Sequence, residues 1–127
     1  MRLGTLLLGL ALVMSLLVAA CGGSAPEELD ISVAVEQEKL TPETVRVQQG
    51  DMVTLMIEAD DAGDFHLHGY DIERDVSPVR VTDLFLVADA TGRFKITFHA
   101  EEAATGGEGE HNEEEEVTIG YLEVLPR

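Results

Sequence analysis

Hydrophobic residues recur at every second position through most of the chain beyond residue 30. Ile31, Val33 and Val35 open this pattern, which returns at 45–47, 53–57, 94–98 and 117–125, with two less regular stretches near 65–72 and 79–87. A period of two puts alternate side chains on opposite faces of a strand, as in a sheet with one buried face. No segment has the 3.6-residue period of an amphipathic helix, so the pattern predicts an all-β domain.

Turn-forming residues separate these runs. Thr41-Pro42, Gln49-Gly50-Asp51, the stretch 60–64, Ser77-Pro78 and Thr91-Gly92 all have turn composition. About seven or eight short strands within one domain favour two packed antiparallel sheets, a Greek-key β-sandwich.

The first residues have a different composition. A short basic start is followed by an uncharged apolar run over Leu3–Val18, then by Ala19, Ala20 and Cys21. Small residues before a lone cysteine resemble a bacterial lipobox, in which a peptidase cuts before the cysteine and the cysteine carries lipid. We therefore expect a signal peptide over 1–20 and lipidation of Cys21. An ordinary secretory signal or an uncleaved anchor are the alternatives.

This interpretation sets the rest of the domain plan. Residues 21–30 are small, polar and acidic, so we expect a flexible tether followed by one domain over 31–127. The protein would lie outside the cytoplasm, anchored by lipid on the periplasmic side or on the outer cell surface. Cys21 is the only cysteine, so core packing alone would hold the domain together without a disulfide.

The chain is strongly acidic, with 25 acidic against 8 basic residues and a net charge of −17. Nucleic-acid binding needs clustered Lys and Arg against phosphate, so this balance argues against it. It is compatible with attraction of cations, although solubility alone explains much of it. Residues 101–116 hold eight of the acids, and we expect a solvated loop that could contact a protein partner.

Four histidines are the candidate chemistry of the chain: His66, His68, His99 and His111. His66 and His68 are two residues apart, a spacing that places both imidazoles on one face, at the start of a strand. His99 follows the strand 94–98, and His111 lies in the acidic segment. If these strand ends converge, they form a nitrogen-rich site suited to copper or zinc. Four separate surface histidines are the alternative.

Four segments, taken in order, resemble a cupredoxin domain. They are residues 41–53 with the Gly50-Asp51 turn, His68-Gly69-Tyr70, Asp89–Phe94 and Gly120–Val124. In plastocyanin-like and copper A domains, the segment matched by His68 supplies the first histidine ligand. The resemblance covers about residues 40–127 and implies a cupredoxin-type sandwich with a copper site.

The sequence departs from the blue-copper pattern at the ligands. That pattern uses two histidines, a cysteine thiolate and a weak axial methionine. No cysteine follows the strand 94–98, where His99 stands instead, and Thr118 and Ile119 occupy the place of the methionine. Strict alternation would also turn Phe98, not His99, inward. His99 and His111 match the pattern by order alone, and His66 is additional.

Three functions therefore remain open. The first is a membrane-tethered protein that binds copper, with zinc as competitor, through the histidines, in metal homeostasis or delivery. The second is a metal-free cupredoxin-like domain whose acidic loop binds a partner. Electron transfer is the least supported because the thiolate is missing, and no nucleophile or phosphate-loop motif predicts an enzyme.

Overall fold

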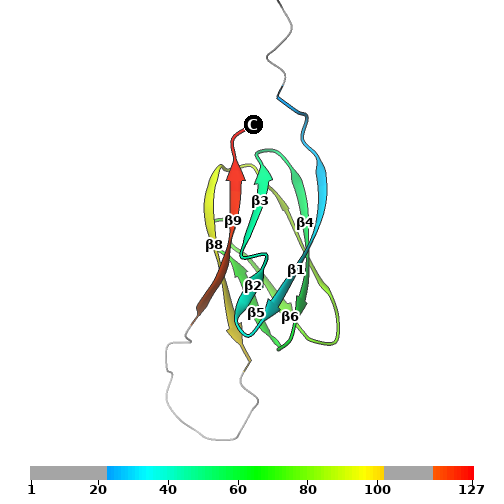
Figure 1. Cartoon of the computed structure of the whole chain (residues 1–127), viewed down its shortest axis with the longest axis vertical. Helices are drawn as coiled ribbons and strands as arrows, with labels where there is room; N and C mark the ends of the chain where they lie inside the picture. The colour runs from blue at the N-terminus through cyan, green and yellow to red at the C-terminus, as the bar shows by residue number, and fades with distance from the viewer. Residues whose placement is uncertain (1–22, 102–115) are drawn as a thin grey trace, which may run out of the picture.

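Two β-sheets pack face to face in the computed structural model, which describes residues 23–101 and 116–127 (Figure 1). The first sheet has the order β2-β1-β4-β7, formed by β1 (Glu28–Glu36), β2 (Lys39–Thr41), β4 (Met52–Ala59) and β7 (Thr82–Val87). The second has the order β3-β9-β8-β5-β6, formed by β3 (Thr44–Gln48), β9 (Val117–Leu125), β8 (Gly92–Ala100), β5 (Gly63–Leu67) and β6 (Ile72–Val76). The predicted all-β sandwich is confirmed.

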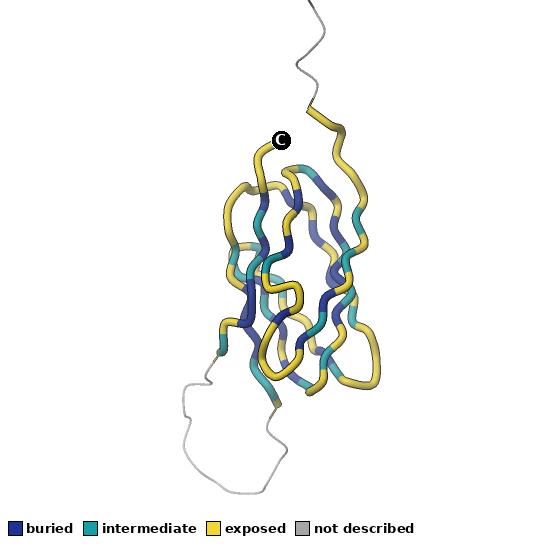
Figure 2. The backbone as a smooth tube through the Cα atoms, in the orientation of Figure 1, coloured by how far each residue is buried: buried dark blue, intermediate teal, exposed yellow. Residues whose placement is uncertain are grey.

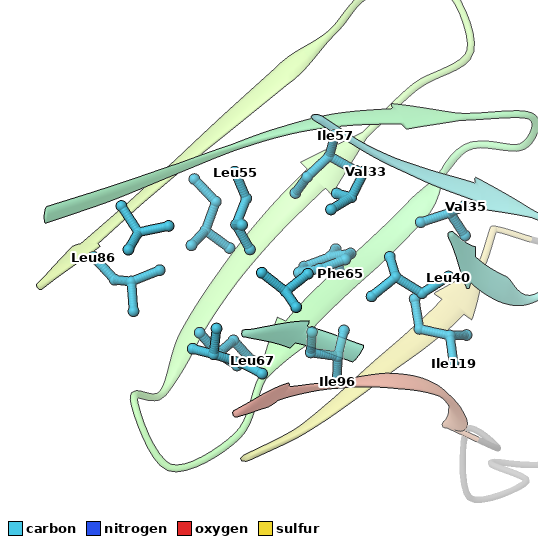
Figure 3. Close-up of a cluster of buried hydrophobic side chains, with 14 of the residues drawn as sticks. Val33, Val35, Leu40, Leu55, Ile57, Phe65, Leu67, Leu86, Ile96 and Ile119 are labelled. Carbon is cyan, nitrogen blue, oxygen red and sulfur yellow. The ribbon is translucent and has the colours of Figure 1, made fainter. Parts of the chain in front are cut away.

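The core lies between the sheets and follows the period of two. Val53, Leu55 and Ile57 of β4 are fully buried, and Phe65 and Leu67 of β5 meet them from the other sheet (Figure 3). Buried and exposed positions alternate along these strands (Figure 2). Burial of each large apolar side chain contributes about 1.5–3 kcal/mol, which is the main stabilisation of this domain.

The described residues contain nine strands, two more than the seven hydrophobic runs of the sequence. One extra strand, β2, has three residues, too few to show a period. The other, β6, has the sequence IERDV, with three exposed charged residues in succession, because its outer edge faces solvent. The stretch near 65–72 is therefore interrupted by a turn between β5 and β6.

Two strand pairs run parallel, which differs from the antiparallel sandwich expected from the sequence. β1 pairs in parallel with β4, and β3 pairs in parallel with β9. The chain passes from the first sheet to the second at the cis Thr41–Pro42 peptide, between β2 and β3. Hydrophobic alternation sets which face of a strand is buried but carries no information on the direction of the strand. The parallel pairs could therefore not be predicted from the sequence pattern.

The start of the domain also differs from the expected boundary. Residues 28–30 belong to β1, where the sequence predicts the end of a tether, and Met52 N donates a 2.9 Å hydrogen bond to Glu27 O. Pairing with β4 orders a segment whose composition is that of a linker. Cys21, the signal segment 1–20 and His111 lie outside the described residues. Within the described residues, 23–101 and 116–127, no helix is long and apolar enough to cross a membrane.

Candidate metal centre

His66 and His68 face the same side of the second sheet. In β5, Phe65 and Leu67 point into the core, so His66 points outward. His68 follows the strand, and its backbone N donates a 2.9 Å hydrogen bond to Lys95 O, which keeps the pairing with β8 beyond Leu67. The two imidazole centroids lie 3.9 Å apart with the rings tilted by 32°. The shared face predicted from their spacing is present, at the end of the strand and not at its start.

Glu116 joins the two histidines from a segment far away in the chain. It directly precedes β9, and β9 pairs with β8, which in turn pairs with β5. Glu116 Oε1 lies 3.5 Å from His66 Nδ1, and Glu116 Oε2 lies 3.4 Å from His68 Nε2. One ligand atom from each of the three residues lies within 4.8 Å of the others.

The Thr97 hydroxyl lies beneath this group. Thr97 is directly opposite His66 in the β5–β8 register and is only 1% exposed. Its Oγ1 lies 2.9 Å from His68 Nε2 and donates to Glu116 Oε2 at 3.3 Å. A buried hydroxyl bonded to both residues fixes their relative position.

The electrostatics favour a neutral imidazole beside an ionised carboxylate. Burial lowers the pKa of His68, and the neighbouring charges of His66 and Lys95 lower it further. Burial acts to raise the pKa of Glu116, but the interaction with His66, the charge of His68 and the Thr97 hydrogen bond outweigh it, and that pKa lies below its usual value. Both are the protonation states in which these side chains bind a metal.

One atom of the group lacks a hydrogen-bond partner. His66 Nδ1 is buried, and the nearest carboxylate oxygens, from Glu116 and Glu73, lie 3.5 Å and 3.7 Å away, beyond a good hydrogen bond. An unpaired buried nitrogen costs about 1–3 kcal/mol, which a bound cation would offset. Ligand atoms in a tetrahedral site with bonds of about 2.0–2.1 Å are separated by roughly 3.3 Å, and the three ligand atoms here lie within 4.8 Å of one another, so the side chains would draw together around an ion.

The donor set indicates which metals fit. Two imidazole nitrogens and a carboxylate suit Cu(II) and Zn(II), and three protein ligands leave a position open for water or a further ligand. His66, His68 and Glu116 include no sulfur, and the chain has no cysteine after Cys21. The side chains of His66 and His68 are 19% and 29% exposed, so an ion could reach the group from solvent.

His99 lies on the same outer face but outside this group. It is opposite Asp64 in the β5–β8 register, whereas Phe98 points into the core and is 2% exposed. This is the orientation that strict alternation predicts, although the β8–β9 register shifts between Ile96 and Thr97. His99 and His66 line one cleft of about 600 Å³ together with Asp64, Glu73, Arg74, Asp75 and Glu116.

Glu116 was absent from the sequence-based candidates. It is the last of four consecutive glutamates, and the acidic segment offered several carboxylates with nothing to distinguish them. The signal that could have identified it is position, because it immediately precedes the closing strand, as His68 immediately follows β5. His111 lies outside the described residues.

Comparison with known proteins identifies the fold but no sequence family. No family model and no curated protein matches the chain. A heme-copper terminal oxidase structure matches with a TM-score of 0.61 and 12% identity, over 94% of this chain and 91% of the other. An apo copper binding protein matches with a TM-score of 0.54 and 11% identity, over 80% and 92%.

A third structure adds a further comparison. The periplasmic domain of cytochrome oxidase subunit II from Bradyrhizobium japonicum matches with a TM-score of 0.54 and 13% identity, over 77% of this chain and 84% of the other. At these identities the likeness shows the fold alone. The fold is cupredoxin-like, as the order of the sequence segments predicts.

Proposed function

We propose that this cupredoxin-like domain is a membrane-anchored extracytoplasmic protein that binds copper through His66, His68 and Glu116. The observation that carries the proposal is the convergence of these three side chains, from two distant segments, within 4.8 Å. The buried, unpaired Nδ1 of His66 supports it further. Copper is favoured over zinc because nitrogen and oxygen sites generally bind Cu(II) more tightly than Zn(II).

Metal holding or delivery fits this site better than electron transfer. A blue copper centre needs a thiolate, and the three grouped side chains offer none. Partial exposure of both imidazoles would let the ion exchange with a partner. We propose a binding protein and not an enzyme, since metal ligation accounts for the chemistry of these residues.

An extracytoplasmic location is proposed on two grounds. One structural neighbour is a periplasmic domain, and the first 21 residues have the composition of a lipoprotein signal that ends at Cys21. Acylation of Cys21 would hold the mature chain on the membrane, since each buried CH₂ contributes about 0.8 kcal/mol.

Calorimetric titration with Cu(II), then Zn(II), tests the metal site. The mature chain should bind one Cu(II) tightly, and His66→Ala or His68→Ala should weaken binding by at least an order of magnitude. His99→Ala is the matched control, because His99 lies in the same cleft but outside the group. An equal loss of copper affinity in His99→Ala would mean that His99 is also a ligand. His111→Ala tests whether His111 completes the site.

The opposite result would support the metal-free alternative. Weak uptake at several sites, unchanged by His68→Ala, would leave a metal-free cupredoxin-like domain. The acidic segment 101–116 would then be the feature to investigate for a protein partner.

A further inference from the structure

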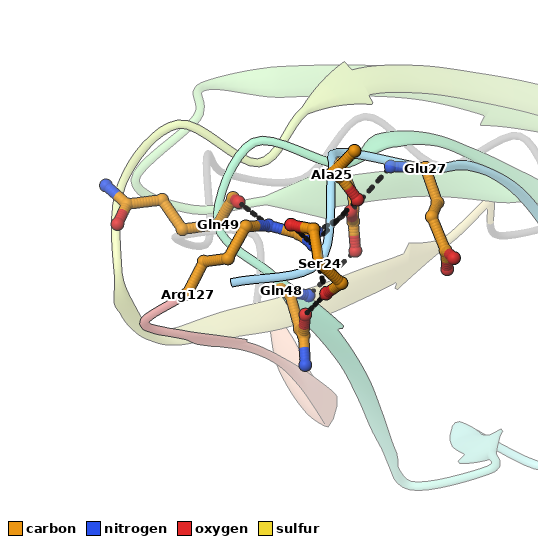
Figure 4. Close-up of polar contacts among 7 residues, drawn as sticks. Ser24, Ala25, Glu27, Gln48, Gln49 and Arg127 are labelled. Atoms are coloured by element: carbon orange, nitrogen blue, oxygen red, sulfur yellow. Dashed lines mark hydrogen bonds and ion pairs between the residues drawn. The ribbon is translucent and has the colours of Figure 1, made fainter. Parts of the chain in front are cut away.

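One arginine ties together the two ends of the described chain. Arg127 Nη1 donates to Ser24 O at 2.6 Å, to Ser24 Oγ at 2.7 Å and to Ala25 O at 2.8 Å, while Nε donates to Gln49 O at 2.9 Å (Figure 4). Nη2 also contacts Asp51. We call these contacts the Arg127 clasp. The chain is thus fixed from Ser24 onward.

The clasp is anchored in the body of the domain. Asp51 is 3% exposed, and its carboxylate accepts hydrogen bonds from the backbone N of Glu27 at 3.0 Å and of Gln48 at 2.9 Å. The buried carboxylate is therefore saturated with donors from three segments. Through Arg127, Ser24 and Ala25 are held against the tight turn between β3 and β4.

The fixed segment leaves little chain between the domain and Cys21. Three residues of extended chain span at most about 10 Å. A lipid on Cys21 would therefore keep the clasp within about that distance of the membrane surface. From Ser24 onward the chain is held, although its composition predicts a flexible tether as far as residue 30.

Exposed apolar side chains surround the same end of the sandwich. Met52 and Val87 form a cross-strand pair and are 38% and 44% exposed. Phe85, the next outward residue of β7, is 55% exposed, and Leu125 is 42% exposed and lines a cleft with Ser24. Two other exposed residues, Val79 and Val81, lie in the β6–β7 connection beside Glu58, at the far end of β4.

The metal group lies near the middle of the outer face of the second sheet, since His66 is opposite Thr97 and His68 N bonds to Lys95 O, both in the centre of β8, and only Glu116 lies toward the far end. β9 begins next to Glu116 and ends at Leu125, and a nine-residue strand extends about 30 Å. The N-terminal side of β1, the end of β9 and the start of β4 lie together at the top of Figure 1, while the start of β9 lies in the lower half.

We propose that the clasp end, with Met52, Phe85, Val87 and Leu125, rests on the lipid bilayer and leaves the metal group, on the outer face of the second sheet, clear of it. This orientation rests on the proposed acylation of Cys21. The apolar side chains and the short connection supply the contact, since the acidic chain gains nothing from anionic head groups. Held in this way, the site faces the aqueous compartment, where a metal donor or acceptor can reach it.

The test uses the full chain, processed in bacteria and placed in phosphatidylcholine vesicles. Asp89→Cys, beside the clasp, and Asp61→Cys, in the β4–β5 turn at the far end, are a matched pair of exposed positions. Acylation leaves each variant with one free thiol, which can carry a bimane label. Quenching by doxyl-labelled phosphatidylcholine should be several-fold stronger at position 89 than at position 61.

Two results would each overturn a claim, and two variants add further readouts. Equal quenching, or stronger quenching at position 61, on a chain whose mass confirms the acyl group overturns the orientation alone. A mass without the acyl group overturns both the orientation and the proposed anchor. Phe85→Ser should reduce quenching at position 89 without lowering the melting temperature. Arg127→Gln should reduce the difference in quenching between positions 89 and 61. Copper binding should be unchanged in both variants.

Discussion

His68 and Thr97 share a 2.9 Å hydrogen bond between Nε2 and the hydroxyl oxygen, and the same hydroxyl donates to Glu116. A hydroxyl has a single hydrogen, so with Glu116 as its acceptor it must accept from His68. Nε2 is then the protonated nitrogen of His68. A metal that binds through Nε2 needs this nitrogen without its proton, so binding should shift the proton of the neutral imidazole to Nδ1, with no net release to solvent.

Thr97→Val should weaken copper binding by about fivefold. Removing a hydroxyl that orients a ligand typically costs 10- to 100-fold in affinity. Part of that loss is recovered, because Nε2 no longer has to give up a hydrogen bond of about 1 kcal/mol. Titration calorimetry measures the change, with Thr118→Val as control because Thr118 lies opposite Thr97 on β9 but outside the metal group. Unchanged copper affinity in Thr97→Val would show that the Thr97 hydroxyl does not position Glu116 for metal binding.

Glu116→Gln should weaken copper binding by about tenfold or more, or ~1.4 kcal/mol, because it removes the negative charge and one good oxygen ligand. The same change should lower the pKa of His68, since the charge of Glu116 acts to raise it. NMR titration of the imidazole protons gives this second readout without metal. Glu123→Gln, on the outer face near Arg46, is the control. A His68 pKa that rises in Glu116→Gln would contradict the described contact.

Asp64→Asn should stabilise the domain at neutral pH. Burial raises the pKa of Asp64, and the carboxyl of Asp75, directly opposite on β6, raises it further. Because the folded-state pKa is raised, ionisation disfavours the folded state, and stability falls as pH rises from the usual aspartate pKa of 3.8 toward the folded-state pKa. Like charges across a strand pair cost about 0.2–1 kcal/mol. Urea unfolding at pH 7 and pH 3 should show the gain at pH 7 only.

Asp51→Asn should destabilise the domain by about 2–3 kcal/mol at pH 7, the cost of weakening hydrogen bonds to a buried charged group. Hydrogen bonds from the backbone of Glu27 and Gln48, with the charge of Arg127, lower the pKa of Asp51 despite its burial. With a lowered folded-state pKa, this stabilisation is complete above the usual aspartate pKa of 3.8 and is lost as pH falls below it toward the folded-state pKa. The variant's stability should therefore depend less on pH between 5 and 2 than that of the parent, as measured by thermal unfolding.

Gly69→Ala should reduce both stability and copper affinity. Gly69 has a φ of 86°, and an added Cβ would overlap the Phe94 ring. The turn after His68 would have to move, at a cost of about 1–3 kcal/mol. Because His68 is adjacent, its imidazole should lose its alignment with Glu116. Circular dichroism melting and copper titration on one sample would measure both effects, and normal values for both would show that the turn tolerates a side chain.

The sequence by itself determined the class of fold, much of the core and two of the three members of the metal group. Alternation at 45–47 and 53–57 identified residues that the structure buries, because a period of two fixes which face of a strand meets the core. The same period placed His66 and His68 on one face, and kept Phe98 inward and His99 outward. Each of these results depends only on positions within one strand.

Tertiary structure decided everything that depends on which strands are neighbours. The parallel β1–β4 and β3–β9 pairs, the selection of Glu116 from an acidic run, and the Arg127–Asp51 contact all join residues far apart in the chain. Strand order and direction arise from packing of the whole sandwich, and local hydrophobic patterns do not encode them. For this reason the histidines could be found from the sequence, but the carboxylate that completes their group could not.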